Sequence, residues 1–510
     1  MAVSYQAGWS ALTARDLEAI AEGRARLVLG AGSVQRMGVS RETVESLMHR
    51  GQVVYGVNTG FGNLVSERIP DAALRDLQRN LLRSHACGVG ETLTDPESRA
   101  MVALRAHSLA FGHSGVRPQL VRALLALLAK NVVPVIPLRG SVGASGDLAP
   151  LAHLALVLIG EGRARVGARR SEVGGAVALR RAGLRPVVLA PKEGLALING
   201  TQLMAGVGSL SWCRAERVLL AAELAAAMSV EALLGSVKPF DERFARVRPH
   251  PGHAETAARL RSMLRGSGIV ASHRNCGRVQ DAYTERCVPQ VLGSVRDSLR
   301  YVRRCLEIEI NSVSDNPLVF GGEVISGGNF HGQPVATALD VATIALAQVA
   351  GFSERRTFRM LDAKLGELPA FLARRPGLES GLMLVQYTAA ALVAELKVLS
   401  HPASVDTIPT SASTEDHVSM GSVAATKLRQ AVPLAARVVA AELVAAAEAQ
   451  DRRRPLRPAA ATGNGRDAVR RYVPPLTGDR PLGGQLDVLA EAILDGSFPA
   501  LPDPRKAGVS

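Results

Sequence analysis

Apolar residues recur at intervals of three and four over most of the chain beyond Ser98, the spacing of one face of an α-helix. In the stretch 117–130, Pro118 stands at the expected helix start, where proline is well tolerated. The same pattern predicts long helices at about 210–234, 288–311, 333–352, 381–399 and 418–450. Several of these carry Ala and Leu around most of their circumference, which predicts burial inside a bundle or between subunits.

Segments typical of β-strands are short and few. They are predicted at 52–55, 132–136, around 175–189 and, as a hairpin, 318–325. Pro433 lies inside the last long helix and is expected to kink it. We therefore expect a mainly α fold, built as a long-helix bundle with a smaller mixed α/β region. Its expected parts are an N-terminal mixed region at 1–200, a central long-helix bundle at 201–451 and a C-terminal tail region at 452–510.

Composition indicates a folded protein and raises one question about partners. The 510 residues are 47% hydrophobic and 21% charged, so a large core is available. The net charge of +14 would suit a nucleic-acid partner. The basic residues are, however, scattered and often stand beside Asp or Glu, and only 4% of residues are aromatic. We expect an arginine-biased solvated surface and no nucleic-acid partner.

Neither export nor metal binding is indicated. The first residues lack a basic segment followed by an apolar one, and the longest uncharged run, 194–213, is interrupted by polar residues and glycines. We expect no membrane partner. The five cysteines include no Cys-x-x-Cys pair, which argues against a disulfide framework and a zinc site. A reducing cytoplasm is the expected location, and no metal site is expected.

The stretch GSVGASGDLAPLAHL, residues 140–154, contains a candidate for unusual chemistry. Its glycines predict a turn, Asp147 is expected to cap a helix, and Pro150 suits the first turn of that helix. This explanation leaves out Ser145, which stands between Ala144 and Gly146 in a glycine-bracketed loop.

A chemical interpretation accounts for all three residues. In a strained loop the Gly146 amide nitrogen can attack the Ala144 carbonyl carbon, and glycine suits this position because it has no Cβ. Loss of two waters, one of them from the Ser145 hydroxyl, then gives a conjugated ring. Such a ring is an electrophile, which no ordinary side chain supplies. A helix N-terminus beside it would favour the build-up of electron density there.

This stretch resembles the signature of the aromatic amino acid ammonia-lyase family, in which Ala-Ser-Gly becomes a 4-methylidene-imidazol-5-one group. The resemblance extends over nearly the whole chain, through YGVNTGFG, LALINGTQ, VQDAYTERCVPQV, NSVSDNPLVF, SGGNFHGQP and SASTEDHVSMG. It implies a 4-methylidene-imidazol-5-one group formed from Ala144, Ser145 and Gly146, with no external cofactor. It also implies a helical homotetramer core with sites assembled from several subunits.

The resemblance also implies roles for individual side chains. Tyr55 matches the catalytic tyrosine that acts as base. Arg286 matches the arginine that binds the substrate carboxylate, a task suited to a planar, bidentate donor. Tyr283 and Gln280 match the tyrosine and glutamine beside the electrophile, and they share a face with Arg286 if the segment is helical. Each of these residues could instead have an ordinary structural role.

The remaining matches concern the substrate. Asn199 resembles the asparagine near the electrophile and carboxylate, and Phe330 resembles an aromatic residue that packs there. His85 follows Ser84 as in the histidine-specific members, and Glu415 stands where the phenylalanine-specific members have Gln. A carboxylate that faces an imidazole N–H can orient the substrate ring, whereas a bare phenyl ring would leave it poorly satisfied.

The expected reaction is elimination of ammonia from L-histidine to give trans-urocanate. Two alternatives stay open: a lyase or aminomutase acting on tyrosine or phenylalanine, and a non-catalytic basic helical protein that has kept the fold. The sequence also departs from the family pattern. Thr284 and Glu285 replace a frequent Ser-Leu pair, Ala282 replaces a usual Pro, and Thr414 replaces a common Gln. These departures put the rate and the substrate preference in question more than the reaction type.

Overall fold

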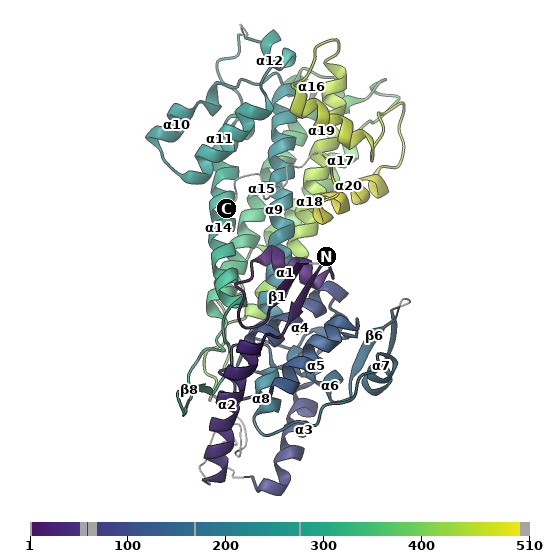
Figure 1. The fold of residues 1–510 in the computed structure, drawn as a ribbon. Helices are drawn as coiled ribbons and strands as arrows, with labels where there is room; N and C mark the ends of the chain where they lie inside the picture. The colour runs from purple at the N-terminus through teal and green to yellow at the C-terminus, as the bar shows by residue number, and fades with distance from the viewer. Residues whose placement is uncertain (1–2, 51–58, 60–68, 168–169, 275–276, 500–510) are drawn as a thin grey trace. The chain divides into compact units, whose positions relative to one another are not determined.

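The computed structural model describes residues 3–50, 59, 69–167, 170–274 and 277–499, and the structural statements below concern these residues. They form a mainly α-helical protein, as predicted (Figure 1). The chain folds into two compact units, each of which is described by itself. The first unit comprises Met1–Leu210, Arg303–Asp340 and Pro402–Thr426, and the second comprises Ser211–Val302, Val341–His401 and Lys427–Ser510.

The first unit is built around helix α4 (Asp95–Ala110), which is buried along nearly its whole length. A capping box fixes the start of α4: the Thr94 hydroxyl accepts from the Glu97 N–H, and the Glu97 carboxylate accepts from the Thr94 N–H. The other helices are α1 (Ala14–Ala21), α2 (Ala31–His49), η2 (Asp71–Ala73), α3 (Leu74–His85), α5 (Pro118–Ala129), α6 (Leu148–Leu158), α7 (Gly175–Arg181) and α8 (Glu193–Ile198). Helices α1 and α5 pack against α4.

Four small sheets accompany the helices of the first unit. Strands β1 (Val3–Gln6) and β2 (Ala25–Val28) pair in parallel, with Val3 opposite Ala25. Strands β3 (Val89–Thr92) and β5 (Pro137–Arg139) are antiparallel. A three-stranded antiparallel sheet has the order β4 (Val133–Pro134), β6 (Arg163–Val166), β7 (Ser171–Gly174), and β8 (Leu318–Phe320) forms a hairpin with β9 (Glu323–Ile325).

The second unit contains most of the long helices. Figure 1 shows α9 (Gln202–Ala232), α14 (Val288–Ile310), α15 (Gln333–Leu361) and α18 (Gly421–Arg452) side by side. The shorter helices are η3 (Lys238–Phe240), α10 (Glu242–Val247), α11 (Pro251–Met263), α12 (Gly268–Ser272), α13 (Tyr283–Arg286), α16 (Ala363–Gly366), η4 (Ala370–Leu372), α17 (Met383–Leu399), α19 (Ala460–Arg470) and α20 (Gly483–Asp495). Every residue of 438–450 in α18 is buried, which fits the Ala-rich composition of this stretch.

Helices α15 and α18 are long and apolar enough to cross a membrane by length and composition alone. In the folded protein, however, 61% of the most apolar window of α15 and 78% of that of α18 are buried. Burial of this extent is typical of the core helices of a soluble protein.

The predicted long helices are all present, whereas one strand prediction is wrong. Residues 175–181 form α7 instead of a strand, because the buried residues Gly175, Ala178 and Leu179 have the i, i+3, i+4 spacing of one helical face. The 318–325 hairpin is confirmed, and the strand predicted at 132–136 shortens to β4. Helix α18 runs through Pro433 without interruption. The strand predicted at 52–55 lies outside the described residues.

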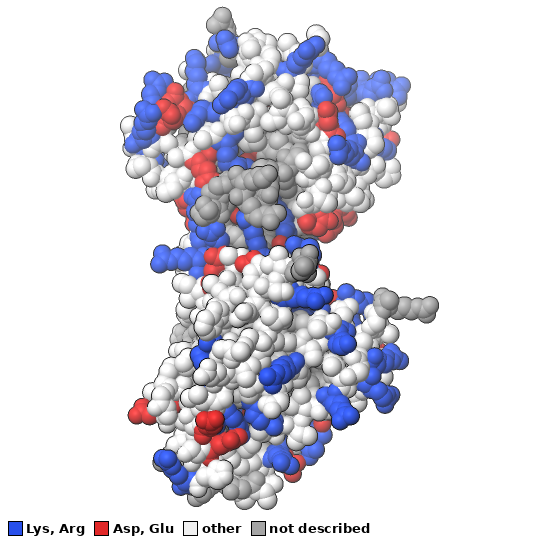
Figure 2. Space-filling model, in the orientation of Figure 1, with Lys and Arg blue, Asp and Glu red and all other residues white. Residues whose placement is uncertain are grey.

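The surface charge is dispersed. Figure 2 shows Lys and Arg side chains over the visible faces of both units, with Asp and Glu side chains among many of them. Several of the arginines are paired, as in Arg83 with Glu161 and Arg165 with Asp95. Several of the basic side chains are therefore compensated locally by a neighbouring carboxylate.

Candidate active site

The loop between β5 and α6 contains the tripeptide Ala144, Ser145 and Gly146, for which the sequence predicts unusual chemistry. Three of its residues have left-handed backbone conformations: Gly143 has φ +81°, Ser145 +51° and Gly146 +81°. The Gly146 N–H donates to the Gly143 carbonyl oxygen at 3.3 Å, which closes a tight turn around Ala144 and Ser145. A non-glycine residue in this conformation costs about 1–2 kcal/mol. The loop therefore holds Ser145 in a strained conformation.

Gly146 is packed against the segment that follows Asn199. The two residues Gly146 and Gly200 form an isolated parallel bridge, and the Asp147 N–H donates to the Gly200 carbonyl oxygen at 2.7 Å. A Cβ atom on residue 146 would lie 2.3 Å from that same oxygen. Only glycine fits here, so the absence of a side chain at the expected attacking nitrogen is also required by packing.

We expect the substitution Gly146→Ala to lower the free energy of unfolding by about 2–4 kcal/mol, because it adds a backbone clash to an unfavourable φ. Chemical denaturation measures this loss. Gly38→Ala in α2 is the control, because a Cβ there meets nothing within 4 Å and alanine favours a helix. Equal unfolding midpoints for Gly146→Ala and the wild type would contradict the expectation.

The Asp147 side chain does not cap α6, so the sequence interpretation of this residue was wrong. Its carboxylate instead accepts from the Leu203 and Met204 N–H groups at 2.9 and 3.0 Å, in the first turn of α9. Burial raises the pKa of Asp147 to about 7, although these two N–H groups lower it. A carboxyl group that titrates near neutrality beside Gly146 can accept or donate a proton at physiological pH.

Ser145 and Glu415 meet within the first unit, although 270 positions separate them. The Ser145 hydroxyl donates to Glu415 Oε1 at 3.1 Å, and the Thr410 hydroxyl donates to Glu415 Oε2 at 2.6 Å. Two backbone hydrogen bonds between Thr410 and Glu415 hold this turn in shape. Both oxygens of the half-buried carboxylate are therefore directed by neighbouring hydroxyls.

His85 lies at the last position of α3 and is held by its own helix. Its Nδ1 is 2.9 Å from the Leu81 carbonyl oxygen. Since a carbonyl only accepts, this bond places the proton on Nδ1 and leaves Nε2 as an acceptor in the neutral ring. Burial lowers the pKa of His85, and the charge of Glu415 opposes this shift. His85 is thus a neutral imidazole under the electrostatic influence of Glu415.

Asn199 and Phe330 complete the predicted residues of the first unit. Asn199 ends α8 and is 3% exposed, and its carbonyl oxygen accepts from Arg105 at 2.8 Å. Its side-chain Oδ1 is buried and has no hydrogen-bond partner, which is costly unless a ligand supplies a donor. Phe330 is half-buried in the loop before α15.

The remaining predicted residues belong to the second unit, except Tyr55, which lies outside the described residues. Helix α13 brings Tyr283 and Arg286 together, with the guanidinium carbon 4.8 Å from the centre of the tyrosine ring. Arg286 Nε is buried without a hydrogen-bond partner. Gln280 is exposed and precedes α13, so the helix groups only two of the three side chains.

Comparison with known proteins decides the family. Residues 12–471 match the family described as aromatic amino acid lyase. The chain belongs to the aromatic amino acid lyase family. It is 52% identical over 498 residues to the histidine ammonia-lyase of Sorangium cellulosum (strain So ce56), with 96% of each chain covered. It is 50% identical over 488 residues to that of Gloeobacter violaceus (strain ATCC 29082 / PCC 7421), with 95% of each chain covered.

Solved structures of this lyase family have the same fold. Histidine ammonia-lyase from Trypanosoma cruzi superposes with a TM-score of 0.91 at 39% identity, covering 99% of this chain and 97% of that chain. Tyrosine aminomutase from Streptomyces globisporus superposes with a TM-score of 0.92 at 39% identity, covering 98% of each chain. The fold is therefore common to enzymes named for different substrates, and substrate preference depends on individual residues.

Sequence reasoning missed several residues that shape the loop of this family member. Ser141 donates from its hydroxyl to the Gly146 carbonyl oxygen at 3.2 Å, and Ser422 donates to the Ser141 carbonyl oxygen at 2.6 Å. Thr410 orients Glu415, as described above. Ser141 was within the quoted signature, but Thr410 and Ser422 gave no local signal, because their roles depend on contacts between distant segments.

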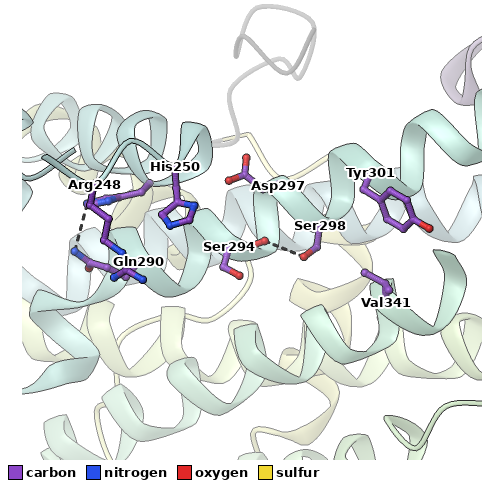
Figure 3. A pocket seen from close by; sticks show the side chains of 9 residues that line it. Arg248, His250, Gln290, Ser294, Asp297, Ser298, Tyr301 and Val341 are labelled. Carbon is purple, nitrogen blue, oxygen red and sulfur yellow. Dashed lines mark hydrogen bonds between the residues drawn. The ribbon is translucent and has the colours of Figure 1, made fainter. Parts of the chain in front are cut away.

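A cavity of about 440 Å³ lies in the second unit, between the start of α11 and one face of α14 (Figure 3). Its lining residues are Arg248, His250, His253, Gln290, Ser294, Asp297, Ser298, Tyr301 and Val341. None of the predicted site residues lines it. Within the described ranges, no group of three or more His, Cys, Asp or Glu residues is placed to hold a metal ion.

Proposed function

We propose that this protein eliminates ammonia from L-histidine to give trans-urocanate. The proposed electrophile is a 4-methylidene-imidazol-5-one group formed from Ala144, Ser145 and Gly146, without an external cofactor. The observation that carries the proposal is the hydrogen bond between the Ser145 hydroxyl and Glu415, because it links the reactive loop to the residue that favours an imidazole ring.

The loop fits the proposed cyclisation. A bond forms between the Gly146 nitrogen and the Ala144 carbonyl carbon, and the Ala144 carbonyl oxygen and the Ser145 hydroxyl leave as two waters. The left-handed turn and the missing Cβ at residue 146 bring this short segment close to the required bend. The group would supply an electrophile that activates the substrate amine as a leaving group.

Loss of the Ser145 hydroxyl changes the surroundings of Glu415. Its Oε1 loses a donor, whereas Oε2 keeps the Thr410 hydroxyl. An imidazole N–H of the substrate can replace the missing donor, and the neutral His85 offers a further ring nitrogen nearby. A phenyl side chain has no such donor and would leave the carboxylate unsatisfied.

The other proposed roles follow the chemistry of each side chain. Arg286, with an unpaired buried Nε, would bind the substrate carboxylate, and Asn199, with an unpaired buried Oδ1, would accept a hydrogen bond from the substrate. Tyr55 would remove the β-proton. Tyr283, Gln280 and Phe330 would line the site.

We further propose a homotetramer in a reducing cytoplasm, with sites assembled from several subunits. Exposed apolar side chains on α17 support a protein partner for the second unit: Leu384 is 54%, Tyr387 57% and Val398 75% exposed. Self-association would cover them, and its symmetry could complete each site with residues from a second copy.

A tyrosine-specific enzyme is the second candidate, favoured by the close structural similarity to tyrosine aminomutase. Parallel assays with L-histidine, L-tyrosine and L-phenylalanine separate the two. We expect kcat/KM for histidine to exceed the value for phenylalanine by at least about a hundredfold, because a phenyl ring offers Glu415 no hydrogen-bond donor, and we expect histidine to be preferred over tyrosine as well. Formation of the conjugated acid product is followed by absorbance. Turnover of tyrosine without turnover of histidine would refute the proposed substrate.

A further inference from the structure

Helix α13 is a single turn and depends on its neighbours for its position. Its four residues, Tyr283–Arg286, cannot form a stable helix on their own in water. Ala282, at the N-cap, provides no side-chain hydrogen bond. The placement of Tyr283 and Arg286 must therefore come from contacts with other helices of the second unit.

One of these contacts is an ion pair beneath the turn. Arg359 of α15 donates from Nε to Glu285 Oε1 at 2.9 Å, and the side chain of Glu285 is only 1% exposed. Burial raises the pKa of Glu285, and the Arg359 guanidinium opposes this rise. Arg359 and, to a smaller extent, Arg278 favour the charged form of this carboxylate.

A second arginine of α15 holds the preceding residue. Arg356 donates from Nη1 to the Thr284 carbonyl oxygen at 3.2 Å. Its other nitrogens bind both oxygens of Glu442 at 2.5 and 2.8 Å, and both side chains are fully buried. Such a two-point pair fixes the guanidinium plane. Two arginines one turn apart on α15 therefore hold two consecutive residues of α13.

The same turn also carries Tyr283 and Arg286, the two side chains proposed to face the ligand. Tyr283 is 69% exposed, and Arg286 lies over its ring with Nε unpaired. Because Glu285 and Arg286 are consecutive, any movement of the Glu285 backbone also moves the Arg286 guanidinium. The turn thus carries a buried, ion-paired carboxylate next to an arginine whose Nε has no hydrogen-bond partner.

We propose that the Arg359–Glu285 ion pair is a positioning element that sets Arg286 for binding the substrate carboxylate. This inference rests on the proposed function, because it takes the carboxylate role of Arg286 as given. It also accounts for a departure from the family sequence pattern, in which Leu is frequent at the position of Glu285: this chain carries a buried carboxylate together with the arginine that neutralises it.

The test compares KM with kcat. In Arg359→Gln we expect KM for L-histidine to rise about tenfold while kcat stays within about threefold, since the carboxylate contact is the same in the ground state and the transition state. Inhibition by imidazole, which has no carboxylate, should be unchanged. Arg359→Lys keeps the charge but loses the planar guanidinium, and its KM should rise by about threefold.

Arg259→Gln is the matched control. Arg259 donates from Nε to the fully buried Glu223 at 2.6 Å, and its side chain is 17% exposed, against 21% for Arg359. This pair does not contact α13, so its loss should lower stability without changing KM. The inference is overturned by an unchanged KM in either folded Arg359 variant, by an equal rise in Arg259→Gln, or by an equal weakening of imidazole inhibition.

If the proposed substrate is wrong, the assays give a different pattern of activities. If the wild-type protein deaminates L-tyrosine and not L-histidine, the substrate assignment fails, and the same variants are compared with L-tyrosine and with phenol as the ring-only ligand. A selective rise in KM for the amino acid still supports the positioning role. A wild-type protein inactive toward all three amino acids overturns both the function and the inference.

Discussion

Replacement of Ser145 by alanine is expected to lower kcat for histidine by at least about a thousandfold while leaving the protein folded. The hydroxyl is the group that must leave as water for the conjugated ring to form, and alanine has nothing to lose at this position. The intact mass should show the difference directly. The wild-type chain should be lighter than its encoded sequence by two waters, whereas Ser145→Ala should not reach this state.

The fold should survive because Ser145 makes few contacts. Its side chain contributes one hydrogen bond, to Glu415, and removal of that bond costs about 1–3 kcal/mol at most. Ser298→Ala on α14 is the control, because the Ser298 hydroxyl only donates to the Ser294 carbonyl oxygen. A wild-type protein with the mass of its encoded sequence, or a fully active Ser145→Ala, would refute the proposed electrophile and favour a non-catalytic protein that has kept the fold.

The helical part of the fold could be predicted because its signal is local. Each long helix carries its own apolar repeat, and helix α14, predicted at 288–311, forms at Val288–Ile310. The strand predicted around 175–189 was wrong for a related reason. Its valines and short apolar runs suggested a strand, but the residues that become buried, Gly175, Ala178 and Leu179, follow the i, i+3, i+4 spacing of one helical face.

The site could be predicted only as far as its residues form recognisable segments. The tripeptide at 144–146 and the resemblance around it were visible in the sequence. The hydrogen-bond partners of the Asp147 carboxylate could not be predicted. Asp147 directly precedes α6, but its side chain caps α9, which begins far along the chain. The partner of Glu285 could not be predicted either. The sequence shows Glu285 only as a departure from the family pattern, and its contact with Arg359 exists only in the folded chain.

Replacement of Glu415 by glutamine should lower kcat/KM for histidine by about a hundredfold. Glutamine keeps the shape and one acceptor oxygen but removes the charge that strengthens a hydrogen bond from an imidazole N–H. It also offers an N–H₂ group toward the Thr410 hydroxyl, which now donates to Oε2 at 2.6 Å. The relative rate with phenylalanine should rise, because no half-buried charge is left without a donor beside the phenyl ring.

Steady-state assays on both amino acids measure this change, and the intact mass shows where the effect arises. If Glu415→Gln still lacks two waters, the loop has cyclised and the loss belongs to substrate recognition. Asp416→Asn is the matched control, since it removes the charge of the adjacent, exposed carboxylate. If the kinetics with histidine are unchanged in Glu415→Gln, Glu415 does not select the substrate. The electrophile proposed for 144–146 must then be tested by evidence that does not involve Glu415.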